Sequence, residues 1–93
     1  MSEPIIRGCY VLYDVVAEEA GPIFDAKNDA MAVRLSLPAL ADAPFVRDIR
    51  LLKVAEIDAS TGQVNIVYPI KDIHYSTMLD AYQAQLQIKE VTE

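Results

Sequence analysis

A tight turn between two apolar segments is the feature that most constrains how this chain can fold. Residues 50–58 and 64–70 are rich in Val, Ile and Leu, as strands are, and the turn Asp58-Ala-Ser-Thr-Gly-Gln63 joins them. The Asp58 carboxylate can accept hydrogen bonds from the amides of the turn, and Gly62 supplies the positive φ angle that a tight reversal needs. The pattern therefore predicts a β-hairpin, and with it an antiparallel sheet.

A third strand is predicted at residues 7–16. Apolar side chains occupy both alternating sets of positions, with Cys9, Val11, Tyr13 and Val15 on one face and Tyr10 and Leu12 on the other. Apolar residues on both faces indicate a central strand that is covered on two sides. We expect residues 18–22 to form a loop, closed by a short extended piece at Ile23-Phe24.

The first helix is predicted over residues 30–41, after this strand. Asn28 or Asp29 can serve as its N-cap, because the side chains of both accept hydrogen bonds from the free amides of a first turn. Pro38 lies inside the segment and removes one helical hydrogen bond. The helix therefore either kinks near Leu37 or restarts at the proline.

The second helix is predicted over residues 75–91, where Thr77 and Asp80 have the spacing of a capping box. One apolar stripe runs along this helix, formed by Tyr75, Leu79, Tyr82 and Leu86. The stripe either packs on the sheet or forms an interface with a second copy of the chain.

These elements give an α+β fold in the order β-α-β-β-α. A small antiparallel sheet of three to four strands packs against two helices, in a single domain over residues 1–93. The hydrophobic fraction of 53% is high for 93 residues, and so short a chain buries only about 60–65% of its unfolded surface. We therefore expect part of the apolar surface to be covered by a partner, and a homo-oligomer is the expected form.

The side chains needed for catalysis are scarce. The chain has one His, His74, and one Cys, Cys9, which are too few for a zinc site and too far apart in sequence for a convincing nucleophilic dyad. Cys9 lies in an apolar segment, which favours a buried structural thiol. The isolated glycines form no phosphate-binding loop. Oxygens near the hairpin turn lack the spacing of a calcium loop. We expect a protein that is not an enzyme and that needs no cofactor or metal.

The net charge of −6 opposes broad attraction to nucleic acid, but one basic cluster is present, formed by Arg47, Arg50 and Lys53. In a strand Arg50 would point away from the other two, whereas a turn at 47–49 would bring Arg47 and Arg50 to one positive lip. Tyr10 and Tyr13 could stack on unpaired bases, although core positions are the commoner use of such residues.

Nothing in the sequence indicates a membrane protein. The first seven residues include Glu3 and Pro4 and lead into no apolar stretch typical of a signal peptide. No segment reaches the roughly 18–20 apolar residues of a membrane span. A single cysteine suits a reducing compartment, so we expect a cytoplasmic protein.

Six short fragments occur in an order that resembles the nonstructural protein of gokushovirus-type microviruses, which are small phages with single-stranded DNA genomes. The fragments are Tyr10-Val-Leu-Tyr13-Asp14, Pro22-Ile-Phe24, Asn28 with Ala32 and Arg34, Pro44-Phe45, Leu51, and Asp58–Gly62. The resemblance covers about two thirds of the chain, over residues 9–70.

The resemblance implies a non-enzymatic protein that is absent from the virion. Its role would be to steer the phage genome from duplex replication towards single-strand synthesis and packaging. The implied partners are single-stranded DNA, the replication initiator or the procapsid. The residues expected to contact DNA are Arg34, Arg47, Arg50 and Lys53. Tyr10 and Tyr13 are the next candidates after these four. The alternative is a homo-oligomeric protein-interaction module without affinity for DNA.

Overall fold

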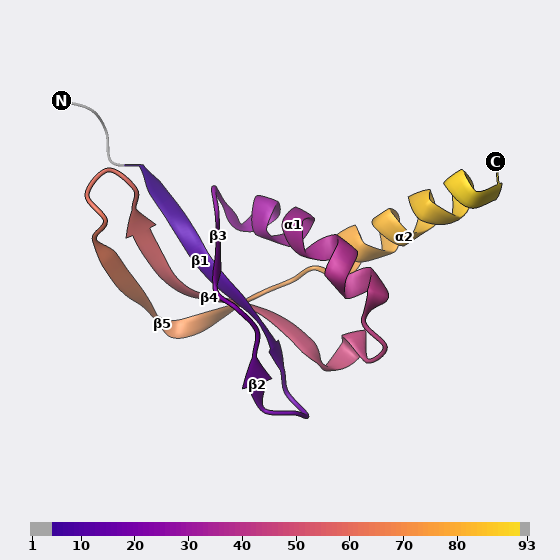
Figure 1. Ribbon diagram of the computed structural model, residues 1–93, viewed down its shortest axis with the longest axis horizontal. Helices are drawn as coiled ribbons and strands as arrows, with labels where there is room; N and C mark the ends of the chain where they lie inside the picture. The colour runs from indigo at the N-terminus through magenta and orange to yellow at the C-terminus, as the bar shows by residue number, and fades with distance from the viewer. Residues whose placement is uncertain (1–4, 92–93) are drawn as a thin grey trace.

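The computed structural model describes residues 5–91, with side chains up to residue 88, as a five-stranded antiparallel sheet and two helices (Figure 1). The predicted α+β class is confirmed, although the sheet has five strands rather than three or four. The strands are β1 (Ile6–Asp14), β2 (Glu19–Ala20), β3 (Phe24–Ala26), β4 (Ile49–Asp58) and β5 (Val64–Ile73). The helices are α1 (Asp29–Asp42) and α2 (Ser76–Val91), and a single 3₁₀ turn, η1, spans Val46–Asp48.

The first strand is internal to the sheet, as predicted. On one side β1 pairs with β4, which in turn pairs with the edge strand β5. On its other side β1 pairs with both short strands, β2 opposite Tyr13 and Asp14, and β3 opposite Gly8 to Tyr10. The expectation of a loop at 18–22 was therefore partly wrong, because Glu19 and Ala20 join the sheet.

The predicted hairpin between β4 and β5 is confirmed. The Asp58 amide donates to the Gln63 carbonyl at 2.9 Å, and the Asp58 carboxylate accepts from the Ser60 amide at 2.9 Å. Gly62 has a φ of 80°, in the left-handed region that glycine adopts without strain. Further along, the register between β4 and β5 shifts, so that residues 67–70 of β5 bulge opposite Val54.

Both helices begin close to the predicted positions. The Asn28 side chain accepts a hydrogen bond of 2.9 Å from the Met31 amide, which confirms the N-cap of α1. This helix runs through Pro38 without restarting. The capping box at Thr77 was wrong: the Leu79 amide already donates to the Tyr75 carbonyl, so Thr77 lies inside the first turn of α2.

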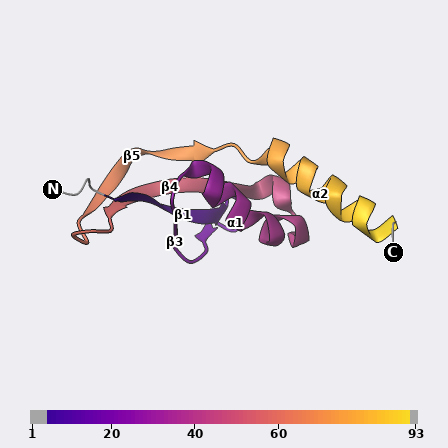
Figure 2. The ribbon, with the colours of Figure 1, turned by 90° about the horizontal axis from the view of Figure 1, so that it is seen from above.

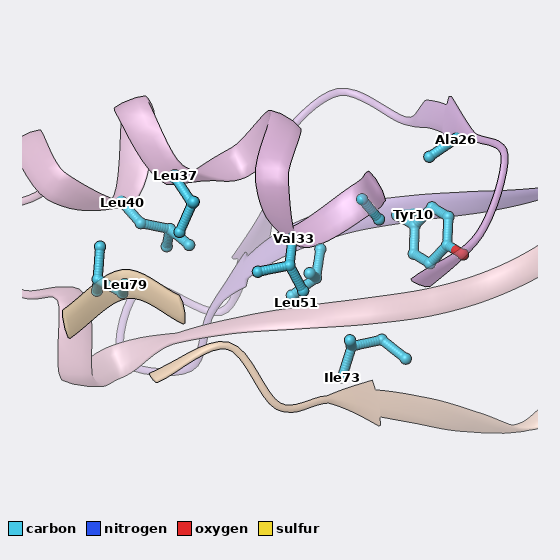
Figure 3. Close-up of a cluster of buried hydrophobic side chains, with 9 residues drawn as sticks. Tyr10, Ala26, Val33, Leu37, Leu40, Leu51, Ile73 and Leu79 are labelled. Atoms are coloured by element: carbon cyan, nitrogen blue, oxygen red, sulfur yellow. The ribbon is translucent and has the colours of Figure 1, made fainter. Parts of the chain in front are cut away.

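The core lies between one face of the sheet and the helices (Figure 3). The sheet contributes Tyr10, Leu51 and Ile73, while α1 and α2 contribute Val33, Leu37, Leu40 and Leu79; all of these are at most 7% exposed. Within residues 5–91, neither helix packs against the opposite face of the sheet, and α2 extends away from the body of the molecule (Figure 2). The helices therefore cover only one of the two faces of β1. On the other face Val11 is nevertheless 6% exposed, so the prediction that both faces would be covered is met at Val11 without a helix.

Candidate functional site

A cleft of about 690 Å³ opens where η1, the start of β4, the end of β5 and the start of α2 meet. Residues from all four elements line it, namely Val46, Arg47, Arg50, Asp72, Ile73, His74, Tyr75, Ser76, Leu79, Asp80 and Gln83. We call it the arginine cleft, because Arg47 and Arg50 line one wall. Leu79 and Ile73 belong to the hydrophobic core, so the floor of the cleft is apolar and its rim is charged.

The 3₁₀ turn brings the two arginines to the same place. Val46–Asp48 form η1 rather than extended strand, so the turn alternative that the sequence left open is the one adopted. The Arg50 guanidinium donates a hydrogen bond of 3.1 Å from Nη1 to the backbone carbonyl of Arg47. Two positive side chains therefore converge on the cleft, which the carboxylates of Asp72 and Asp80 also line.

Tyr75 fixes the helical wall of the cleft to this turn. Its hydroxyl lies 2.9 Å from the carbonyl of Val46 and 2.6 Å from that of Ile49, and its single proton is shared between these two acceptors. Burial raises the pKa of the Tyr75 hydroxyl, while the nearby Arg50 acts in the opposite direction. The phenol therefore stays a neutral donor that holds the start of α2 against η1.

The two arginines differ in their ionic partners. Nε of Arg50 lies 3.8 Å from Oδ2 of Asp72, and both side chains are about half exposed, so this pair is weak. Arg47 forms no ion pair with any residue in the part of the chain that the structure describes. Its charge is available to an anion from solution.

His74 and Ser76 lie beside each other on the rim. Oγ of Ser76 is 3.1 Å from Nε2 of His74, and Oγ1 of Thr77 is 3.3 Å from the same nitrogen. A hydroxyl beside an imidazole is the first requirement of a nucleophilic site, but no carboxylate among the described residues hydrogen-bonds the ring to orient it. The group is better suited to donating hydrogen bonds to a bound anion.

Tyr10 is buried and cannot present its ring to DNA. It is 0% exposed, its ring stacks on that of Phe24 with centroids 5.8 Å apart, and its hydroxyl donates to Asp29 at 2.6 Å. The hydrogen bond from Tyr10 is the largest cause of the lowered pKa of Asp29. A ring enclosed in this way cannot stack on a base, so the structure removes Tyr10 from the candidate contacts.

Lys53 belongs to the same internal network. Its Nζ lies 3.0 Å from Oε1 of Glu56 and 3.8 Å from Oδ1 of Asp29, and Nζ of Lys71 lies 2.9 Å from Oδ2 of Asp29. Asp29 is the first residue of α1, and sequence reasoning gave it no role beyond a cap. The lysines therefore neutralise Asp29 and fix α1 to the sheet, which leaves little of the Lys53 charge for a ligand.

The two remaining predicted DNA contacts lie outside the arginine cleft. Arg34 is exposed on α1 and forms no ion pair with a described residue. Tyr13 is half-buried and lies on the face of the sheet opposite the helices, where it pairs with Arg50 across the strands. Of the six predicted contacts, only Arg47 and Arg50 line the arginine cleft. His74 and Tyr75 complete the site, and no local sequence pattern connects them to residue 47.

The predicted interface stripe on α2 divides into two parts. Leu79 is 5% exposed and belongs to the core, and Tyr75 and Tyr82 pack against that core. Leu86 is 40% exposed. The first part of the stripe therefore packs within the chain, and only its last member is free to meet a partner.

Metal ligands do not cluster among residues 5–91, since no group of three His, Cys, Asp or Glu side chains comes together there. Neither described helix has the length and apolar character needed to cross a bilayer. Comparison with known proteins gives no relative: no family model, no curated protein and no solved structure matches the chain.

Proposed function

We propose that this chain is a non-enzymatic accessory protein of a small single-stranded DNA phage, and that it acts by binding single-stranded DNA at the arginine cleft. The proposed process is the passage from genome replication to packaging. The proposed binding site rests on one observation: Arg47 and Arg50 lie side by side on one wall of a cleft. Arg47 forms no ion pair within residues 5–91, so its charge is available to a phosphate. The phage origin rests on the ordered fragments that resemble the microvirus nonstructural proteins.

The chemistry of the cleft suits a phosphate chain better than a duplex. Guanidinium groups bind phosphate oxygens through paired N–H donors, and hydroxyls at the rim can add single hydrogen bonds. The protein has a net charge of −6, so a long duplex would meet repulsion outside the cleft. A flexible single strand can place one or two phosphates in the cleft while its remaining length avoids the acidic surface.

Fluorescence anisotropy with labelled single-stranded and double-stranded oligonucleotides, measured over a salt series, tests this proposal. We expect weak binding that favours the single strand and is strongest at the lowest salt concentration. Each arginine that contacts a phosphate should contribute about 0.7 to the slope of log K against log salt. The double variant Arg47→Gln/Arg50→Gln should lower that slope by about twice this amount.

Arg34→Gln is the matched control, because it removes one charge from an exposed arginine that does not line the cleft. It should leave most of the affinity intact. If Arg34→Gln weakens binding as much as Arg47→Gln does, the contact is a general charge effect rather than a site. Absence of binding at about 50 mM salt would exclude the DNA-binding role, since electrostatic affinity is largest there.

A protein-interaction module without DNA affinity is the second candidate. It is favoured by the exposed apolar side chains of β5, of which Ile66 is 82% exposed and Tyr68 is 91% exposed. Replication and procapsid proteins of the same phage would be its partners. The anisotropy experiment separates the two candidates, because the second one requires no affinity for either form of DNA.

A further inference from the structure

The face of the sheet that carries no helix is built from apolar side chains. Cys9, Val11 and Tyr13 alternate along β1 with the core residues Tyr10 and Leu12, so they point to the opposite face. Cross-strand partners share a face, and the partners on β4 and β5 include Leu52, Ala55, Ile57, Val64 and Ile66. We call this surface the open sheet face.

The exposure of the open sheet face rises towards the hairpin. Val11 is 6% exposed and Ala55 is 9% exposed, whereas Val64 is 55% exposed and Ile66 is 82% exposed. An antiparallel sheet with one solvated face normally carries polar side chains on that face. The composition of this face is that of a buried surface. Its own chain buries Val11 and Ala55 but leaves Val64 and Ile66, at the hairpin end, exposed.

The surface area of the molecule is large for its mass and leaves room for an interface. The accessible surface is 6859 Å². A folded monomer of 10.3 kDa has on average about 5,400 Å². The excess of about 1,500 Å² exceeds the ~800 Å² that each partner buries in a standard stable interface.

The shape of the molecule agrees with this area. The radius of gyration is 15.3 Å, whereas a compact domain of 93 residues has about 12 Å. Figures 1 and 2 show why, since the β4–β5 hairpin projects at one end of the molecule and α2 at the other. The apolar Val64 and Ile66 lie on the projecting hairpin, where a neighbouring molecule can reach them.

We propose that the open sheet face is the interface of a homodimer, in which it packs against the same face of a second copy. Two like surfaces meet about a two-fold axis, so a single self-complementary patch on each chain is sufficient. The aligned packing of two sheets, about 10 Å apart, would cover the exposed Val64 and Ile66 together with the half-buried Leu52. This interface differs from the α2 stripe that the sequence suggested.

The charges of the open sheet face permit two acidic chains to meet there. Arg7 lies at one end of the face and pairs with Asp25 at 2.5 Å. At the other end Arg50 lies 3.8 Å from Asp72. Each cation on the face therefore has an anion of its own chain beside it, so the net charge of −6 lies mainly on the other surfaces. A patch that is apolar and locally neutral fits a second copy better than it fits a charged ligand.

Sedimentation velocity of the parent and of Ile66→Asp tests this proposal. We expect the parent to sediment at twice its 10.3 kDa mass and Ile66→Asp to sediment as a monomer with an unchanged far-ultraviolet circular dichroism spectrum. Leu35→Asp is the matched control, because Leu35 is 56% exposed on α1, in the other layer, and should leave the dimer intact. Val64→Lys, on the same face as Ile66, is the second variant should Ile66→Asp fail to fold.

Three results would overturn the proposal. The first is a monomeric parent at up to about 100 μM, which would mean that the face has no affinity for itself. The second is a dimer that persists in both open-face variants. The third is a dimer that is lost in Leu86→Asp but retained in Ile66→Asp, which would place the interface on α2. All three measurements are made without DNA, so failure of the DNA-binding proposal cannot be mistaken for failure of the dimer.

Discussion

The hydroxyl of Tyr10 in the centre of the sheet donates a hydrogen bond of 2.6 Å to Oδ1 of Asp29, the first residue of α1. The bond joins two elements that are 19 residues apart in the sequence. Two lysines, Lys53 and Lys71, approach the same carboxylate from β4 and β5. The position of α1 on the sheet therefore depends on one carboxylate that three side chains share.

Tyr10→Phe should destabilise the protein by about 2 kcal/mol, the usual contribution of a hydrogen bond to a charged group. The ring remains in place and keeps its contact with Phe24, so only the hydroxyl is lost. Urea unfolding at one fixed protein concentration measures the effect. Tyr13→Phe is the control, because the Tyr13 hydroxyl makes no hydrogen bond to a described residue, and its cost should stay within about 0.5 kcal/mol. Equal costs would show that the Tyr10–Asp29 bond contributes nothing specific.

Acid should weaken the fold through Asp29. Its folded pKa is lowered from 3.8, first by the hydrogen bond from Tyr10 and then by the lysines. A depressed folded pKa stabilises the native state above pH 3.8, and this contribution is lost as the pH falls through the folded pKa. The difference in unfolding free energy between the parent and Asp29→Asn should therefore shrink on titration from pH about 6 to about 3. A difference that is independent of pH would contradict the assignment.

Gly8→Ala should displace the Tyr10 ring. A Cβ at Gly8 would lie 2.6 Å from Cζ of that ring, which is well inside van der Waals contact. Overpacking of this kind costs about 1–3 kcal/mol. Gly21→Ala is the matched control, since its Cβ would meet only the Leu12 carbonyl at 3.5 Å. A thermal unfolding midpoint that falls for Gly8→Ala and not for Gly21→Ala is the expected result.

Local patterns predicted the elements of the fold because each has a local cause. The Asn28 cap, the Asp58–Gly62 turn and the central strand at β1 depend on neighbours a few residues apart, and all three are confirmed. The strands β2 and β3 were harder to predict. They are two and three residues long, and they exist because β1 offers a free edge. Such pairing depends on how distant segments come together in the folded chain, and this cannot be predicted from a short stretch of sequence.

The site was less predictable for the same reason. Arg47 and Arg50 are three residues apart, so a turn was enough to suggest that they meet. Tyr75 reaches the carbonyl of Val46 across 29 residues, which only the completed sheet makes close. The burial of Tyr10 depends on residues of β3 and α1 that pack around it, among them Phe24 and Ala32. As an aromatic residue, Tyr10 was predicted to be able to stack on a base, but in the structure it is buried in the core.

Leu79 and Leu86 occupy the same stripe of α2 and should respond differently to truncation. Leu79 is 5% exposed and contacts the core, so Leu79→Ala should cost about 2–4 kcal/mol by the loss of buried contacts and the cavity left behind. Leu86 is 40% exposed, so Leu86→Ala should change stability by no more than about 0.5 kcal/mol. Urea unfolding and sedimentation of both variants at one concentration separate packing from association. Loss of stability at Leu86 together with a fall in mass would show that the end of α2, rather than the open sheet face, binds the second copy.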